Sequence, residues 1–346
     1  MKNSSSNTSK WHKFKEYKLS YCSFIILCII CVCTLPLELI SNAKPLIISY
    51  QNKIYFPIFK NYSEQTFGGS LAGNADYLDP FIQNAVTGHD NKIENKDNWA
   101  IYPLNNYDAN TINYFYPNPN PASPSKFNYL GTDDAGRDIL SRLLYSLRLS
   151  LWFGFALAVI NLFVGAIIGA MQGYFGGKVD LLTQRFLEIW GNIPEMYLLI
   201  IIASIFQPNI TILLIIFSLF SWLSTADYIR LECLKIKQMD YIKAAKIIGL
   251  KDWQIIKRHM LPNVITPLIT MFPFKVSQGI IVLTAMDFLG LGLPQTTPSM
   301  GSLLSQAKSN LEAWWISIPA VASIMLIVLL LIFIGDGLRH AFNVHK

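Results

Sequence analysis

The stretch LSLWFGFALAVINLFVGAIIGAM, residues 149–171, carries no charged side chain. An apolar run of about 18 residues or more predicts a membrane-spanning helix, because a helix satisfies every backbone polar group inside hydrocarbon. Five further apolar runs, each with at most two charged side chains, occupy residues 19–40, 186–206, 210–229, 264–291 and 314–335. We therefore predict an all-α membrane protein with about six transmembrane helices. Only Gln207, Pro208 and Asn209 separate the third run from the fourth, which predicts a tight antiparallel hairpin.

The composition agrees with a lipid environment and argues against an enzyme. Only 14% of the 346 residues are charged and the mean hydropathy is +0.35, whereas soluble domains average about 25% charged residues. The sequence has neither a phosphate-binding G-x-x-x-x-G-K-[ST] loop nor a zinc-binding H-E-x-x-H motif. Four of the five cysteines lie in or beside the first apolar run, so we predict neither a disulfide framework nor a metal site. We expect no catalytic residue in this chain.

The basic residues predict how the chain is oriented in the membrane, because loops rich in Lys and Arg stay in the cytoplasm. Residues 1–18 form a lysine-rich tail, and residues 230–262 are the most basic connection between two runs. We therefore predict a cytoplasmic tail (1–18), a first transmembrane helix (19–40), a long extracytoplasmic segment (41–147) and a core with the other five helices (148–346). Both termini and residues 230–262 are then cytoplasmic.

Two features of the first half of the chain admit alternatives. The lysines, the apolar run and the Ser41-Asn42-Ala43 sequence that follows them suit either a retained anchor, which we favour because the run is long, or a cleaved signal peptide. The segment 41–147 is rich in aromatic residues and prolines. Aromatic residues at this density can support a small folded layer on the membrane surface. Two roles are open for the segment: a loosely ordered cap that packs on the helix ends, or a contact with a ligand.

Residues 240–263, DYIKAAKIIGLKDWQIIKRHMLPN, predict two short helices joined by a turn. Ile242 and Ala245 recur at helical spacing, and Gly249 is expected to end the first helix because glycine adopts positive φ without strain. The second helix is expected to bury one face made of Trp253, Ile256 and Met260, and Pro262 is expected to end it. Such an elbow suits insertion into a cleft of a partner. The alternative is a solvated basic loop that only sets the topology.

The elbow resembles the cytoplasmic loop of ATP-binding cassette (ABC) importer permeases, whose pattern is E-A-A, three residues, Gly, nine residues, then I-x-L-P. The residues in register are Ala244, Ala245, Gly249, Leu261 and Pro262. Lys243 stands where the pattern has Glu, and His259 where it has Ile. The resemblance implies a type I permease that has no ATPase site of its own. It also implies that this loop docks on a separate cytoplasmic ATPase subunit, which binds the ATP and Mg²⁺, so that this chain holds no cofactor.

A second stretch, LGTDDAGRDILSR at 130–142, resembles a segment of the dipeptide/oligopeptide permease subfamily. Its motif residues are Gly131, Thr132, Asp133, Gly136, Arg137 and Asp138. The segments FLGLG (288–292) and PSMG (298–301) resemble the same subfamily. Parts of 38–69 resemble its long-loop branch, typified by the microcin C-type peptide importer of Gram-negative bacteria. This resemblance implies an inner-membrane location, a second permease subunit, a periplasmic peptide-binding protein, and oligopeptides, modified ones included, as substrates.

Polar residues at membrane depth are candidates for a translocation path, because they are costly against lipid. The candidates are Lys275, Gln278, Asp287, Glu195 and Asn192. Asn192 and Glu195 are expected to share a helical face with Glu188, and the run 264–291 is expected to be broken by its prolines and Gly279. Helix–helix hydrogen bonding is the structural alternative for such residues. For the whole chain, the alternatives are an ion-gradient-driven secondary transporter and a purely structural assembly subunit.

Overall fold

The computed structural model describes residues 4–70, 72–87, 98–112, 114 and 119–342. In these ranges, four helical stretches are long and apolar enough to cross a membrane: Ile139–Phe175, Ile210–Lys237, Asp252–Phe288 and Trp314–Phe342. Two bent helix pairs raise the number to six if each pair is one span. The helices and strands form two compact units. A helical unit contains 1–29, 150–294 and 324–346, and a mixed unit contains 30–149 and 295–323.

The helical unit is built on close packing between α5 (Ile139–Phe175) and α9 (Leu223–Lys237). Gly165, Gly169 and Gly173 lie one turn apart on α5. A Cβ atom at Gly169 would lie 2.4 Å from the carbonyl oxygen of Ala226, so the two backbones approach closely only because these residues lack side chains. Thr225 on α9 also donates a 2.5 Å hydrogen bond to the side chain of Asn161. The two helices are therefore held together by backbone proximity and by a buried polar contact.

The third predicted span is the broken one. It consists of α6 (Gly177–Gly191) and α7 (Glu195–Ile205), which meet at an angle of 59°. Asn192 caps α6 by donating from its side chain to the carbonyl of Glu188 at 2.6 Å. Pro194 keeps the preceding residue, Ile193, away from helical geometry. The hairpin that follows is confirmed: α8 (Ile210–Phe220) begins at Asn209, whose side chain accepts a hydrogen bond from the backbone of Ile212.

The expectation that the fifth span is broken was wrong. α12 (Leu261–Phe288) runs without interruption through Pro267 and Pro273, and it continues the helical run that starts with α11 (Asp252–Ile255) and η2 (Ile256–Met260). A proline inside a membrane helix removes one backbone donor, and neighbouring helices and side chains can satisfy the freed carbonyl. Pro267 and Pro273 therefore stay within the helix, whereas the break at Asn192 also has a capping side chain.

The first predicted run is shorter than expected. α2 (Lys18–Thr34) ends before Pro36, and the short α3 (Leu37–Ile40) follows. The lysine-rich tail is itself helical, as α1 (Ser4–Glu16), and bends 98° from α2. α1 and the residue that joins it to α2 contact the end of α14 (Trp314–Phe342). The ammonium of Lys10 lies 4.8 Å from the Phe342 ring centre, and Tyr17, between the two helices, stacks on His340.

The mixed unit contains the folded layer that the aromatic residues predicted. Strands β1 (Ile47–Tyr50), β2 (Lys53–Tyr55) and β3 (Trp99–Ile101) form an antiparallel sheet in the order β2-β1-β3. The strands pack with η1 (Glu64–Phe67) and α4 (Pro80–Thr87) around the buried side chains Ile48, Phe67, Tyr77, Ile82 and Val86. The unit also contains α13 (Met300–Ser309).

Candidate functional site

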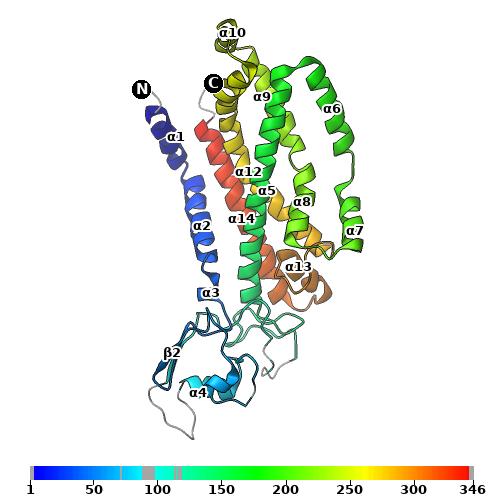
Figure 1. Cartoon of the computed structure of the whole chain (residues 1–346). Helices are drawn as coiled ribbons and strands as arrows, with labels where there is room; N and C mark the ends of the chain where they lie inside the picture. Colours follow the sequence, from blue (N-terminus) through cyan, green and yellow to red (C-terminus); the bar gives the residue numbers. More distant parts are fainter. Residues whose placement is uncertain (1–3, 71, 88–97, 113, 115–118, 343–346) are drawn as a thin grey trace. The chain divides into compact units, whose positions relative to one another are not determined.

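The predicted elbow exists. α10 (Asp240–Ile247) follows α9 after a short turn, and a second turn leads to α11 and η2. Figure 1 shows that α10 projects from one end of the helical unit, beyond the ends of α5 and α9. The chain therefore carries a small helical protrusion between two of its spans.

Gly249 ends α10 in the way the sequence predicted. Its φ is +86°, in the left-handed region. The backbone nitrogen of Gly249 donates to the carbonyl of Lys246 at 3.0 Å, and that of Leu250 donates to Ala245 at 3.2 Å. These two bonds form a Schellman motif, which satisfies carbonyls that the helix end leaves open. A Cβ at Gly249 would meet no atom within 4 Å, so the requirement for glycine is conformational and not steric.

A buried cluster lies beneath the elbow and joins it to three spans. From the elbow it takes Ile242 and Ala245 of α10, Ile255 of α11, and Ile256 and Met260 of η2. From the spans it takes Ala170 and Tyr174 of α5, Ile229, Cys233 and Ile236 of α9, and Val264 of α12. The elbow therefore packs directly against α5, α9 and α12 through one dense cluster, and dense cores of this kind have low compressibility.

Tyr174 connects the end of α5 to the elbow by polar contacts as well. Its phenol donates a hydrogen bond to the carboxylate of Asp252, the first residue of α11. The ammonium of Lys246 on α10 lies 5.0 Å from the centre of the Tyr174 ring. A single buried aromatic side chain thus contacts both short helices of the elbow.

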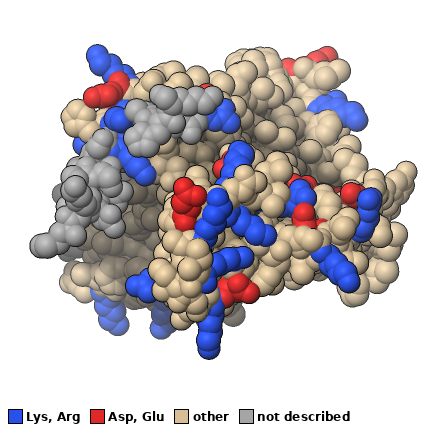
Figure 2. All heavy atoms as spheres, turned by 90° about the horizontal axis from the view of Figure 1, so that it is seen from above, with Lys and Arg blue, Asp and Glu red and all other residues tan. Residues whose placement is uncertain are grey.

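The tip of the elbow exposes apolar side chains. Ile247 and Ile248 are 86% and 79% exposed, and Ala244 and Gly249 are exposed beside them. Figure 2 shows Lys and Arg spread over this end of the helical unit with fewer acidic residues among them. Lys243, which replaces the Glu of the family pattern, is exposed and pairs at 3.3 Å with Asp240. An apolar tip within a basic surface is typical of a docking site for another protein.

Two expectations about the second half of the elbow need correction. Trp253 is 62% exposed and does not share the buried face of Ile256 and Met260; Ile255 is buried there instead. Pro262 does not end the second helix, because η2 continues directly into α12 and Pro262 lies in the first turn, where a missing backbone donor costs little. Leu261, partly buried, packs against the cluster beneath the elbow.

Among the predicted path residues, the structure brings together only Lys275 and Gln278. The Lys275 ammonium lies 3.4 Å from the Gln278 side-chain oxygen and 2.9 Å from the hydroxyl of Ser224 on α9. Asn192 and Glu195 flank the break between α6 and α7, so the expectation that they share a helical face with Glu188 was wrong.

Asp287 stabilises a turn. It is buried near the end of α12, and its carboxylate accepts a 2.7 Å hydrogen bond from the backbone nitrogen of Leu293. A Cβ at Gly292 would lie 1.8 Å from the same carboxylate oxygen, so only glycine fits there. The FLGLG segment therefore folds around Asp287.

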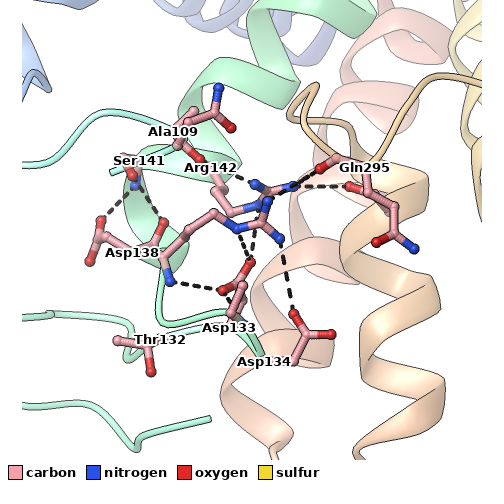
Figure 3. Close-up of polar contacts among 12 residues, drawn as sticks. Ala109, Thr132, Asp133, Asp134, Asp138, Ser141, Arg142 and Gln295 are labelled. Carbon is pink, nitrogen blue, oxygen red and sulfur yellow. Dashed lines mark hydrogen bonds and ion pairs between the residues drawn. The ribbon is translucent and has the colours of Figure 1, made fainter. Parts of the chain in front are cut away.

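The residues of the second motif form a buried polar node in the mixed unit (Figure 3). The carboxylate of Asp133 accepts from the backbone and the side chain of Arg137, both at 2.8 Å, and lies 3.5 Å from Arg142. Arg142 is fully buried and donates to the carbonyls of Ala109 and Gln295 at 3.1 and 3.4 Å. The node therefore ties three stretches that are distant in the sequence to one another.

The remaining motif residues also have structural partners. Asp138 accepts hydrogen bonds from the side chains of Asn105 and Asn128, both at 2.9 Å. The hydroxyl of Thr132 accepts from the backbone of Ala122 at 2.8 Å. Gly131 and Gly136 both have positive φ, of +78° and +83°. In the structure, this motif holds a loop together.

Sequence reasoning missed two important residues, Tyr174 and Arg339. Tyr174 stands at the end of an apolar run, and Arg339 lines a cavity with Lys275 although 64 positions (339 − 275) separate them. No local pattern marks either residue, because their partners are brought close only by folding. In the described part of the chain, no group of three or more His, Cys, Asp or Glu side chains could hold a metal ion.

Residues 161–344 match the family model of the inner membrane components of binding-protein-dependent transport systems. The matched region includes α9, the elbow and α12. The chain belongs to this family. It is therefore a permease subunit, a multi-pass protein of the inner membrane, and not an enzyme in its own right. Permeases of this family work with an ATPase, a substrate-binding protein and a partner permease, and not as ion-gradient-driven transporters.

The relatives are also permeases of ABC transporters. The chain is 43% identical to the inner membrane ABC transporter permease protein YejE of Escherichia coli over 98% of this chain and 97% of that protein. It is 37% identical to the peptidoglycan transport system permease protein YejE of Agrobacterium fabrum over 97% and 92%. It is 37% identical to the oligopeptide transport system permease protein OppC of Lactococcus lactis over 61% and 73%. The long segment after the first run is thus covered by the alignments with the YejE proteins.

Proposed function

We propose that this permease imports oligopeptides and that α10 is the element that receives work from a separate ATPase subunit. The observation that supports this most strongly is the elbow: an exposed apolar tip at Ile247 and Ile248 stands on a buried cluster shared with three spans. A tip without that cluster could bind a partner but could not move the spans.

The proposed mechanism is alternating access, in which ATP bound on the partner biases a two-state element. Closure of the ATPase dimer displaces α10, and the cluster carries the displacement to α5, α9 and α12. The path then opens toward the periplasm, and ATP hydrolysis resets it. ATP and Mg²⁺ act on the ATPase, and this chain contributes Ala244, Ala245, Gly249, Leu261 and Pro262 to the docking loop.

The proposed orientation places both termini and the elbow in the cytoplasm and residues 41–147 in the periplasm. It rests on the basic residues of the tail and of 230–262. The contacts of α1 with the end of α14 are consistent with one side of the membrane for both ends. The proposed assembly has a second, different permease subunit, cytoplasmic ATPase subunits and a periplasmic peptide-binding protein.

The proposed cargo is a short peptide, with modified peptides of microcin C type included. Its support is the naming of relatives as oligopeptide and peptidoglycan transport permeases. Peptides and peptidoglycan fragments share amide bonds and free carboxylates, so one hydrated path can serve both chemistries.

The test is ATP-dependent uptake by vesicles that contain the whole assembly. Radiolabelled tripeptides should accumulate in the vesicle lumen only under two conditions. The lumen, which the ATPase faces, must contain ATP, and the binding protein must be in the solution outside. Accumulation driven by a proton or sodium gradient without ATP would contradict the proposal. The same vesicles without the binding protein are the control.

A further inference from the structure

A cavity of about 440 Å³ lies among α9, α12 and α14 within the helical unit. Its lining includes charged side chains from all three helices, namely Glu232, Lys275 and Arg339, together with the hydroxyls of Thr266 and Thr270. Ionisable residues within membrane spans face a bundle interior or a water-filled space and mark substrate paths. The cavity is therefore a candidate section of the translocation path.

Lys275 lines this cavity and has no carboxylate partner among the described residues. It stands fourteen residues (275 − 261) after the start of α12, about 20 Å along the helix axis. An ammonium has three N–H donors, and both acceptors of Lys275, the hydroxyl of Ser224 and the side-chain oxygen of Gln278, are neutral. Within the described residues, no Asp or Glu oxygen lies within 4.0 Å of its nitrogen. Its positive charge is therefore available to a visiting anion.

The other charges around the cavity leave it positive. Arg339 forms no ion pair in the part of the chain that the structure covers, and its guanidinium lies 5.9 Å from the ring centre of Phe274, the neighbour of Lys275. The carboxylate of Glu232 is already paired with Lys235 at 2.9 Å. Asp227 on α9 and Asp336 on α14 are not among the lining residues. The cavity thus offers two cations and one carboxylate that is neutralised elsewhere.

We propose that Lys275 binds the carboxylate end of a peptide during its passage, with Arg339 adding to the positive field that attracts it. This inference rests on the proposed function. An anionic lipid headgroup is the other anion of a membrane. Arg339, in the last turn of α14, lies near the end of its span, where headgroups lie, but Lys275 lies mid-span, so we assign the peptide carboxylate to Lys275. A site of this kind suits transport, because binding in a path must be strong enough to admit the cargo and weak enough to release it.

The experiment compares two forms of one tripeptide, with a free C-terminal carboxylate or with a C-terminal amide. ATP-dependent uptake is measured in vesicles holding the whole assembly. The concentration of the binding protein is high enough to saturate the permease with either peptide form. The variants are Lys275→Gln, Lys275→Arg and Arg339→Gln. Lys178→Gln is the matched control, because it removes one exposed positive charge of the helical unit outside the cavity.

The expected result is a loss of the preference for the carboxylate form of the peptide over the amide form. Lys275→Gln should raise the KM for the carboxylate form about tenfold, the value of one lost charged hydrogen bond, and should change the amide form less than about twofold. Lys275→Arg should retain most of the preference, and Lys178→Gln should retain all of it. If Lys275→Gln does not assemble, Arg339→Gln supplies the same comparison with a smaller shift in the same direction.

Other outcomes overturn the proposal and can be told apart. If the KM changes equally for both peptide forms, or does not change, the cavity does not bind the peptide carboxylate. An effect that appears only in vesicles with phosphatidylglycerol, and not in phosphatidylcholine alone, assigns the site to an anionic lipid headgroup. If the wild-type assembly takes up neither peptide form but carries another cargo, the proposed peptide function itself is wrong, and the carboxylate site falls with it.

Discussion

The phenol of Tyr174, at the end of α5, donates a hydrogen bond to the carboxylate of Asp252, at the start of α11. The contact links a membrane span to the second short helix of the elbow. Tyr174 is also part of the buried cluster that contains Ile242 and Ala245 of α10. The span is therefore linked to both short helices by packing and by one hydrogen bond.

A double-mutant cycle tests this link. Tyr174→Phe keeps the packing and removes the donor, and Asp252→Asn removes the charge of the acceptor. Since Asp252 is exposed and water can replace the phenol, we expect a coupling free energy of about 1 kcal/mol in the thermal unfolding of the purified permease. We also expect less peptide uptake per ATP hydrolysed in Tyr174→Phe. Additive effects of the two substitutions on the free energy of unfolding would show that the contact does not contribute to stability.

Substitutions at Gly249 test whether backbone conformation governs the elbow. Gly249→Val should destabilise the turn by about 1–2 kcal/mol, because a φ of +86° is strained for a branched residue. Gly249→Asn should be milder, since asparagine tolerates this region, and the site has space for either side chain. The readout is ATP-dependent uptake at equal membrane levels. Normal coupled transport in Gly249→Val would contradict the role assigned to this turn.

The role of the exposed tip in ATPase binding can be tested separately from its role in folding. Ile247→Ser together with Ile248→Ser should leave the free energy of unfolding within about 0.5 kcal/mol, because both side chains are largely exposed. The same change should reduce co-purification of the ATPase subunit. Leu311→Ser is the matched control: Leu311 is 85% exposed but lies in the mixed unit. Equal retention of the ATPase by the wild type, the Ile247/Ile248 double variant and Leu311→Ser would exclude α10 as the docking element.

Removing Arg142 tests the polar node of the mixed unit. Arg142→Met leaves the carboxylate of Asp133 without one of its two cationic neighbours and removes the donor to the carbonyl of Ala109. The carbonyl of Gln295 keeps its hydrogen bond from Arg137. We expect a loss of about 1–3 kcal/mol, because the carbonyl of Ala109 loses its buried donor, whereas Asp133 stays paired with Arg137. Arg142→Lys should recover little, because one ammonium cannot reproduce the planar set of donors. The measurement is the rate of limited proteolysis within 41–147, and an unchanged rate would refute the structural role.

Close packing of α5 on α9 predicts a steric effect. Gly169→Ala places a methyl group 2.4 Å from the carbonyl oxygen of Ala226 and should destabilise the helical unit by about 1–3 kcal/mol. Gly73→Ala is the control, because a Cβ there meets no atom within 4 Å. Thermal unfolding of the purified proteins gives the comparison. Equal midpoints would mean that the two helices can separate without cost.

Some features were predictable because they depend on local sequence. The apolar runs mark the spans since each must satisfy its own backbone in lipid. The stop at Gly249 was predictable because only glycine takes that backbone conformation readily. The pattern around Ala244 and Ala245 was enough to identify the elbow, and the family match confirms the class of protein.

Other features were not predictable from local sequence. Prolines at 194, 267 and 273 look alike in the sequence, yet only Pro194 follows a break, since Asn192 caps the helix end there. Asp287 was predicted to lie on the translocation path, but in the structure its carboxylate stabilises the turn that contains Gly292. Lys275 and Gln278 lie together, whereas Asn192 and Glu195 lie on two helices that meet at an angle.

The sequence by itself therefore determined the membrane spans, the elbow and the family, because hydrophobic length and backbone conformation are properties of neighbouring residues. Only the tertiary structure decided which polar groups are satisfied and which are left available. Tyr174 donates a hydrogen bond to Asp252, whereas Lys275 contacts only neutral acceptors among the residues that the structure describes. The reason is physical: the free energy of a charge in a membrane protein depends on the groups that folding brings to it from other helices.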